Sequence, residues 1–174
     1  MRVRAVLICA IMSAPCSFGQ AEAPVAIIDI TGRIITSDDC DAPGRLEEAY
    51  FGDEKEFSEE LTGRDGVPWR IERRREMKAG RGTYLFAVYQ WEGNAAALIV
   101  HKNDNGRFIR RGGYAYIFGG NGADIRIEKI AFSHGKMEIE IFSIGFLHNG
   151  LAEKEAGYPD EVSHKIKLIL YTAE

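Results

Sequence analysis

The chain has 174 residues, of which 45% are hydrophobic and 28% are charged, and its formal net charge is -4. This length suffices for one domain with a buried core, and the composition is that of an ordinary globular protein. The modest acidic balance, together with the export predicted below, argues against nucleic acid as a partner.

The N-terminus has the three parts of a secretory signal peptide. Arg2 and Arg4 form a basic start, the apolar run Ala5–Ala14 follows, and small residues come next. The alternatives are a membrane anchor or a buried N-terminal helix. Because Pro15 ends the apolar run far short of the roughly 20 residues that a membrane span needs, the signal peptide is favoured.

This leader sets the predicted domain organisation and location. We predict a signal peptide over residues 1–21, with cleavage near 19–23, and a single β-rich exported domain over residues 22–174. The expected location is therefore periplasmic or secreted, with no stable membrane insertion after processing.

The mature chain would keep one cysteine, Cys40, which lies among Asp38, Asp39 and Asp41. A lone cysteine in an oxidising compartment is either buried and inert or exposed and paired with a partner. The acidic neighbours disfavour the reactive thiolate, so the inert reading is preferred.

The first half of the exported domain mixes predicted element types. Residues 25–30 (VAIIDI) are typical of a strand, and 36–44 are polar and acidic, as in a loop. Over 45–61 apolar residues recur four positions apart, as at Phe57 and Leu61, with Glu and Lys between them. This spacing predicts a short helical segment.

From Trp69 onward the pattern indicates strands. Residues 69–77 carry several arginines, which suits an exposed edge strand. Residues 84–91 and 95–100 are apolar on both faces, so we expect this pair at the centre of the sheet, beneath the helical segment. A hairpin turn at 103–106 leads into a strand over 107–118.

The glycine-rich stretch over 110–129 (RRGGYAYIFGGNGADIRIEK) raises the question of a phosphate-binding loop. A dinucleotide loop that used Gly120 and Gly122 would need glycine at position 125, where Ile125 stands, and a helix would have to follow. An alternating, β-branched segment follows instead. These glycines are therefore predicted to turn a corner between strands.

The C-terminal part predicts a hairpin and a last strand. The hairpin joins 125–132 to 137–141, and a change of phase along its first strand predicts a β-bulge near Glu128 and Lys129. After a polar segment, residues 164–171 form the last strand.

The predicted fold class is α+β. We expect a curved antiparallel β-meander of six or more strands, as a sandwich or partial barrel, with the helical segment over 45–61 packed on one face.

Three stretches in the C-terminal part of the chain are similar to segments of other bacterial proteins. They are GRGTYLFAVY at 80–89, NDNGRF at 103–108 and IRIEKIAFSHGKMEIEIF at 125–142. Together they resemble a group of small, uncharacterised exported bacterial proteins. In that group a Gly-x-Gly-Thr-aromatic strand opens a β-meander, and a proline-bearing loop, here with Pro159, precedes the last strand. The resemblance implies an exported β-rich domain and brings no activity with it.

The chemistry-bearing side chains form no recognisable active-site pattern. The four histidines are His101, His134, His148 and His164, and their wide spacing suits solvated side chains better than metal ligands. No nucleophile motif occurs. We therefore predict no catalytic, metal-binding or cofactor-binding residue and no enzyme activity.

Charge is unevenly distributed along the chain. Residues 38–60 hold ten acidic side chains, and residues 64–81 hold seven basic ones. The basic stretch is either a patch for an anionic polymer or lipid headgroup, or an edge strand that pairs with the acidic segment. The second interpretation is preferred.

The functional hypothesis follows from export and from the absence of enzyme motifs. We expect a non-enzymatic binding or inhibitor-type module of the bacterial envelope, whose partner is an envelope protein or a cell-wall component. The alternative is a hydrolase-like or ligand-carrying periplasmic domain, with a site assembled from residues distant in sequence.

The candidate contact surface lies in the irregular segment 147–163. Tyr158 would be its aromatic anchor, with Glu155 and Asp160 beside it. On the other interpretation, Tyr158 folds back and seals the end of the sheet.

Overall fold

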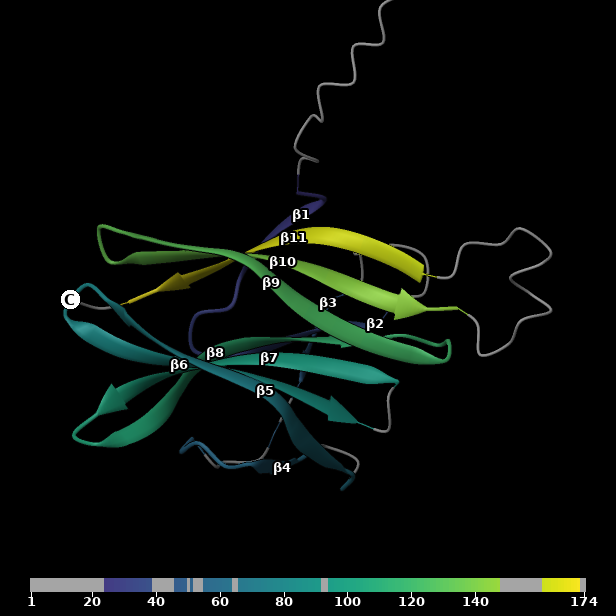
Figure 1. Cartoon of the computed structure of the whole chain (residues 1–174), viewed down its shortest axis with the longest axis horizontal. Helices are drawn as coiled ribbons and strands as arrows, with labels where there is room; N and C mark the ends of the chain where they lie inside the picture. The colour runs from purple at the N-terminus through teal and green to yellow at the C-terminus, as the bar shows by residue number, and fades with distance from the viewer. Residues whose placement is uncertain are drawn as a thin grey trace, which may run out of the picture.

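A computed structural model describes residues 24–38, 46–49, 51, 55–63, 66–91, 94–147 and 161–172. All regular secondary structure in these ranges is β-strand (Figure 1). The strands are β1 (Ala26–Asp29), β2 (Ile34–Asp38), β3 (Leu46–Ala49), β4 (Glu60–Thr62), β5 (Pro68–Ala79), β6 (Gly82–Trp91), β7 (Ala95–Asp104), β8 (Arg107–Ile117), β9 (Gly122–Ser133), β10 (Lys136–Phe146) and β11 (Glu161–Tyr171).

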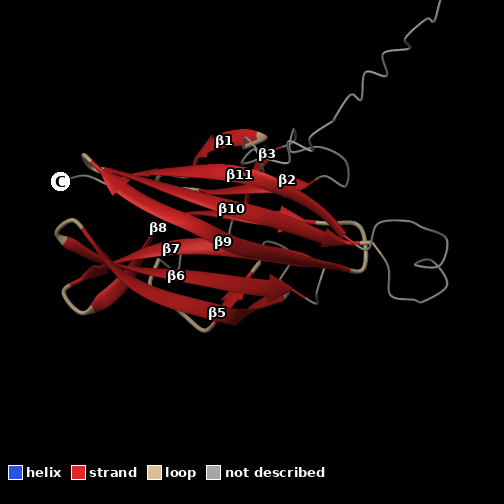
Figure 2. Ribbon diagram, turned by 45° about the horizontal axis from the view of Figure 1, so that its top comes forward, coloured by secondary structure: helices blue, strands red, loops and turns tan. Residues whose placement is uncertain are grey.

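The strands form two sheets, which lie one above the other as two layers (Figure 2). The seven-stranded sheet has the order β3-β2-β8-β7-β6-β5-β4, and the four-stranded sheet has the order β1-β11-β10-β9. Two consecutive antiparallel meanders, β4 to β8 and β9 to β11, make up most of them. The predicted strand-rich meander is therefore present.

Two strand pairings are parallel, unlike those of the predicted antiparallel meander. β1 pairs with β11, and β2 pairs with β8. The chain therefore leaves the four-stranded sheet after β1, crosses to the seven-stranded sheet, and returns after β8. At the first crossing a Cβ atom at Gly112 would lie 2.0 Å from the Ile30 carbonyl oxygen, so only glycine admits the crossing backbone.

The space between the sheets holds the larger apolar cluster, which we call the inter-sheet core. In β6 and β7 it takes every second side chain, as the two-residue period of a strand requires. Its large, almost fully buried members include Tyr84, Phe86, Tyr114, Ile30, Leu98, Ile125, Met137, Ile139 and Ile141.

The predicted α+β fold class is wrong, because the described residues contain no helix. Within the range predicted as helical, residues 46–49 form β3 and residues 60–62 belong to β4. Residue 51 and residues 55–59 are neither helix nor regular strand. The four-residue spacing of apolar residues instead belongs to an extended segment, in which only a few large side chains pack against the sheet. Backbone pairing with β8, in which Phe57 N–H donates to Phe108 O at 2.8 Å, determined the conformation.

That segment covers the second face of the seven-stranded sheet, where the helix was expected. We call residues 55–61 the covering segment. Phe57 and Leu61 pack there, with Phe51, against a second apolar cluster that includes Trp69 and Tyr89. The Tyr89 hydroxyl donates a hydrogen bond of 2.7 Å to Ser58 O. β6 and β7 are thus buried on both faces, as their sequences predicted, but the cover is irregular chain.

Several strand-level predictions are confirmed. The turns after β7 and β9 have left-handed backbone conformations at Asn105–Gly106 and His134–Gly135. The glycine-rich stretch after β8 is a turn, as predicted, and it connects the seven-stranded sheet to the four-stranded sheet. Glu128 is the extra residue of a β-bulge, since Lys129 pairs with Glu140 and Ile127 with Ile141. Among the described residues, β5 has a backbone partner on its outer side at residues 68–71, and the rest of the strand is an edge.

Candidate functional site

Three hairpin turns and the end of β11 meet at one end of the molecule, which we call the hairpin end (left in Figure 1). The turns join β5 to β6, β7 to β8, and β9 to β10. Thr172 N–H donates to Gly135 O at 2.7 Å, which ties the end of β11 to the third turn. Alternate turns of a meander lie on the same edge of a sheet, so chain topology brings these segments together.

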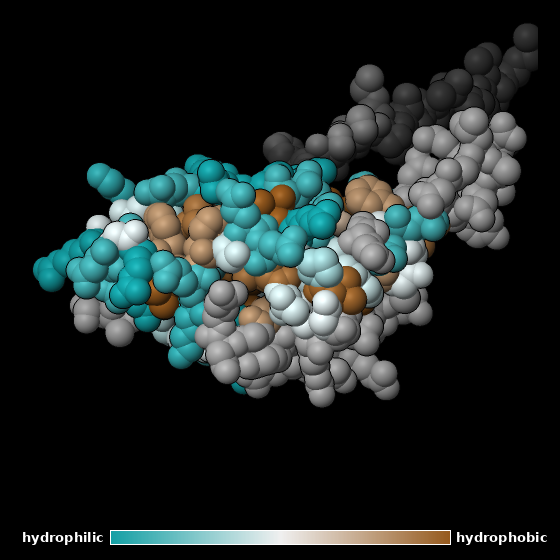
Figure 3. Space-filling model, turned by 90° about the horizontal axis from the view of Figure 1, so that it is seen from below, coloured by the Kyte–Doolittle hydropathy of each residue, from teal (hydrophilic) through white to brown (hydrophobic). Residues whose placement is uncertain are grey.

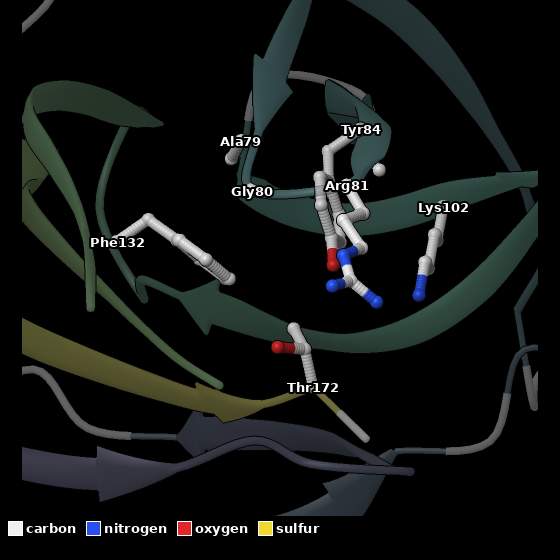
Figure 4. Close-up of a pocket in the computed structure, with 8 residues that line it drawn as sticks. Ala79, Gly80, Arg81, Tyr84, Lys102, Phe132 and Thr172 are labelled. Carbon is white, nitrogen blue, oxygen red and sulfur yellow. The ribbon is translucent and has the colours of Figure 1, made fainter. Parts of the chain in front are cut away.

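The smaller of two cavities at this end has a volume of about 310 Å³. Its walls come from the β5–β6 turn, Tyr84, Lys102, Phe132 and Thr172. Arg81 and Lys102 both line this cavity, and in Figure 4 Phe132 approaches from the opposite strand pair. The Lys102 Nζ atom also lies 5.9 Å from the centroid of the Tyr84 ring. Two cations and aromatic carbon therefore face the same space.

The Gly-x-Gly-Thr motif forms the turn beside this cavity. Gly80 has a φ of 58°, and a Cβ atom there would lie 2.6 Å from the Phe132 ring. Glycine at this position therefore lets the turn close tightly and lets Phe132 lie against it. Arg81 follows at the tip of the turn and is exposed. The motif singled out in the sequence thus shapes a cavity wall.

The larger cavity, of about 580 Å³, adjoins the smaller one through Lys102 and Thr172, which line both. It is bounded by Thr31, Gly32, Lys55, Asp104, Ile109, Arg110, Arg111 and Tyr171. Arg110 and Arg111 are consecutive, and in a regular strand they would point to opposite faces. β8 has an irregularity here, because His101 pairs with Arg110 and Val100 with Gly112, and this bulge allows both arginines to line one cavity.

The two cavities concentrate positive charge on a protein whose net charge is -4. Of the residues that the structure describes, five cationic ones (Lys55, Arg81, Lys102, Arg110 and Arg111) and one carboxylate, Asp104, line them. Arg110 donates to Phe51 O at 3.4 Å. The other four make no ion pair with another described residue. Hydrophilic residues cover most of this end in the view from below (left in Figure 3).

Charge on β5 is mostly neutralised. Arg70 pairs with Glu60 and Arg74 with Glu59, both at 3.2 Å. Arg73 pairs with Asp124 of β9 across the seam between the sheets. The preferred interpretation of the basic stretch is therefore supported for Arg70 and Arg74, although their acidic partners lie in and before β4 and not on helices. The partner of Arg73 lies in β9, outside the acidic segment.

The outer face of the four-stranded sheet is also self-neutralised. Lys165 lies 2.8 Å from Glu128 and 3.3 Å from Glu140, and Lys167 lies 3.2 Å from Glu138. The hydrogen bond from Lys136 and, next, that from Lys167 lower the pKa of Glu138. These contacts leave the two cavities of the hairpin end as the place where described cations outnumber described carboxylates by five to one.

His101 pairs across the sheet with Arg110, which lines the larger cavity, and is not solvated as predicted. Its side chain is 1% exposed, its ring meets Phe57 edge-on at 5.6 Å, and its Nδ1 atom has no hydrogen-bond partner among the described residues. Burial, and then the charge of Arg110, lower the pKa of His101 to about 4. The ring is therefore neutral at ordinary pH and serves packing of the covering segment.

The residues predicted as a contact surface, Tyr158, Glu155 and Asp160, lie outside the described residues, as do Cys40 and the predicted leader. Those predictions stay predictions. In the described part of the chain, no three His, Cys, Asp or Glu side chains are placed to hold a metal ion. Nor does that part contain a helix with the length and apolarity needed to cross a membrane.

Sequence reasoning missed the cations of the hairpin end. The positions of these cations relative to the predicted turns could have indicated the site. Arg81 lies in the turn between β5 and β6, and Lys102 and Arg110 lie close to the turn between β7 and β8. Because alternate turns of a meander share an edge, basic residues near them converge.

Comparison with known proteins finds no match to a protein-family model, to a curated protein or to a solved structure. The site's own geometry therefore carries the functional argument.

Proposed function

We propose that this protein is a non-enzymatic binding module of the bacterial envelope, and that its hairpin end binds an anionic cell-wall component. The observation that carries this proposal is the set of four cations around two adjoining cavities, Lys55, Arg81, Lys102 and Arg111, none of which pairs with a carboxylate of another described residue. The predicted signal peptide supplies the envelope location.

Electrostatics supports an anionic ligand. A concave site lined by charge of one sign focuses its field and attracts counter-ions. Lysine and arginine are the usual protein partners of carboxylates and phosphates, and arginine adds fixed donor geometry. Lys55, Arg81 and Arg111 are exposed, so a ligand can reach them with little rearrangement.

Shape favours a small ligand or a fragment of a polymer over a flat protein surface. The cavities, of about 310 and 580 Å³, lie in the size range of small-molecule sites. A cell-wall component with free carboxylates, such as the stem peptide of a muropeptide, has the size and charge to enter them. The concave shape therefore favours the cell-wall component over an envelope protein as the proposed partner.

The same lining gives less support to a hydrolase. Hydrolysis without a metal commonly uses two carboxylates or a histidine–carboxylate pair. Among the described residues, the lining of the two cavities contains one carboxylate, Asp104, and the neutral ring of His101 is buried and is not part of the lining. The residues present are suited to holding an anion and not to activating water.

The test is calorimetric titration of the processed protein with a muropeptide whose carboxylates are free. We expect binding that weakens between low and moderate salt, because exposed charges are screened. The same muropeptide with amidated carboxylates is the ligand control and should bind much more weakly. Absence of binding to the free-acid form at low salt would contradict the proposal.

A charge-reversal pair localises the site. Arg81→Glu with Lys102→Glu should abolish muropeptide binding, because both cavities lose their shared cation and gain repulsion. The matched control is Arg75→Glu with Lys129→Glu. It makes the same change in net charge at two exposed residues outside the cavities and should bind like the unaltered protein. Equal loss in both pairs would mean that binding depends only on net charge.

A further inference from the structure

The smaller cavity has a chemical character of its own. The carbon-rich side chains of Ala79, Tyr84 and Phe132 form much of its wall, whereas polar and apolar surface contribute about equally to the wall of the larger cavity. Phe132 is partly buried and packs against the inter-sheet core. The cavity therefore opens beside the end of that core, and it places an apolar wall opposite two cations (Figure 4).

Cations at such a site have a preferred kind of ligand. Arg81 and Lys102 approach from one side of the cavity and the Phe132 ring from the other. An inorganic anion would neutralise the two cations but would leave the aromatic wall exposed to water. A neutral apolar molecule would cover the wall and leave the cations without a counter-charge. A ligand that carries both groups satisfies both sides at once.

We infer that the smaller cavity binds an anion bearing a compact apolar group. The carboxylate or phosphate lies between Arg81 and Lys102, and the apolar group lies against Phe132. This inference rests on the proposed function, since it specifies the part of the anionic ligand that enters the smaller cavity. An aryl or short alkyl carboxylate or phosphate is the required chemistry, whether it stands alone or ends a larger molecule.

The glycines of the β5–β6 turn determine the room for that ligand. A Cβ atom at Gly82 would lie 3.0 Å from the Tyr84 ring and 3.1 Å from the Lys102 side chain. At Gly80 it would meet Phe132. Side chains at these two positions would displace the groups that form the cavity. The Gly-x-Gly-Thr motif therefore has a binding role in addition to closing the turn.

The experiment is an amide NMR titration of the processed protein, with Gly80 and Gly82 as reporters. Phenyl phosphate and phenylacetate test the two anionic groups, and inorganic phosphate and acetate are the matched ligands without a ring. Benzyl alcohol is the matched ligand without a charge. We expect each ring-bearing anion to bind at least about tenfold more tightly than its ringless counterpart, and benzyl alcohol to bind at least about tenfold more weakly than either ring-bearing anion.

Two sets of variants separate the roles. Arg81→Gln with Lys102→Gln should abolish the shifts caused by every anion. Phe132→Ala should leave the affinity for inorganic phosphate unchanged and remove the advantage of phenyl phosphate, whereas Phe132→Leu, which keeps an apolar wall and guards against a folding defect, should retain part of that advantage.

Three results would overturn the inference: equal affinity for ringed and ringless anions, binding of benzyl alcohol as tight as that of the anions, or shifts confined to residues away from Gly80 and Gly82. Any one of these results can occur while the free-acid muropeptide still binds and the double variant Arg81→Glu with Lys102→Glu still abolishes that binding. In that case the proposed apolar specificity is wrong, and the proposed anion-binding site is retained. If neither muropeptide nor small anions bind, both proposals fail.

Discussion

The two faces of the seven-stranded sheet are both buried at its centre, but they are covered by different kinds of structure. On β7, Leu98 belongs to the inter-sheet core and Ile99 to the cluster on the opposite face, and both are 0% exposed. A second sheet with continuous strand pairing covers the first face. The opposite face is covered by Phe51 and the covering segment. Among the described residues, the backbone of the segment pairs only over short stretches, with residues 108–110 of β8 and with residues 69–71 of β5.

This difference teaches that burial and rigidity are separate properties. A side chain can be fully buried by a regular sheet or by an irregular segment, and the accessible surface is the same. The irregular cover has fewer backbone bonds to break, so we expect it to open locally at lower free energy. Such a segment can also shift to fill a void, which a paired sheet does less easily.

The largest expected effect compares neighbouring truncations on one strand. We predict that Leu98→Ala lowers the free energy of unfolding by about 3–4 kcal/mol and Ile99→Ala by about 2–3 kcal/mol, because the covering segment can relax into the smaller void. Urea denaturation followed by circular dichroism measures both. A loss for Ile99→Ala equal to or greater than that for Leu98→Ala would break the comparison.

The next effect concerns pH and the irregular face alone. The pKa of His101 is lowered from 6.5 to about 4 in the folded state, so the unfolded chain binds the proton more readily. Stability from this residue is fully present above pH 6.5 and is lost as the pH falls toward 4, at up to roughly 1 kcal/mol per pH unit.

Comparing denaturation curves at several pH values in that window checks this prediction. His101→Phe keeps an aromatic ring beside Phe57 and removes the titrating group. Its stability should depend less on pH between 6.5 and 4 than that of the unaltered protein, while the curves above pH 6.5 keep a constant separation. Identical pH slopes in the two proteins would contradict the role assigned to His101.

The smallest expected effect is the loss of one hydrogen bond that holds the covering segment. Tyr89→Phe removes the donor to Ser58 O and should cost about 1–2 kcal/mol, because a partly buried carbonyl is left unpaired. Hydrogen exchange of the Phe57 amide, which donates to Phe108 O, should accelerate by more than exchange in β7. A uniform acceleration over both would mean that the covering segment does not open on its own.

Local patterns were enough to predict most strands. Alternation and apolar runs identified β5 to β11, and Asn105–Gly106 identified a hairpin turn. The phase slip near Glu128 even located a bulge. These features depend on neighbours in sequence, since the strand period and the left-handed turn conformation are local properties of the backbone.

Residues 45–61 were predicted as helix because apolar spacing alone does not distinguish a helix from an extended segment with few contacts. Phe57 and Leu61 are four apart, which fits one helical face. In the fold both pack against the seven-stranded sheet, and Phe57 pairs through its backbone with Phe108. Tertiary pairing overrode the local preference, as it often does where a sheet offers unpaired backbone.

The candidate site was predictable only in part. The Gly-x-Gly-Thr motif stood out in the sequence, but its interpretation was limited to a turn. The rest of the lining comes from segments far apart in the chain. Phe132 and Thr172 join the β5–β6 turn around the smaller cavity, and Arg110 and Arg111 line the larger one. No local pattern encodes which hairpin lies against which.

From its residues alone, this chain is a β-rich domain with a predicted leader, paired apolar strands and glycine turns, because these follow from short-range backbone geometry and composition. The division into two sheets, the parallel pairings of β1 and β2, the burial of His101 and the meeting of cations at the hairpin end were decided only in three dimensions. Each needs contacts between residues distant in sequence, whose free energy depends on the whole packed arrangement.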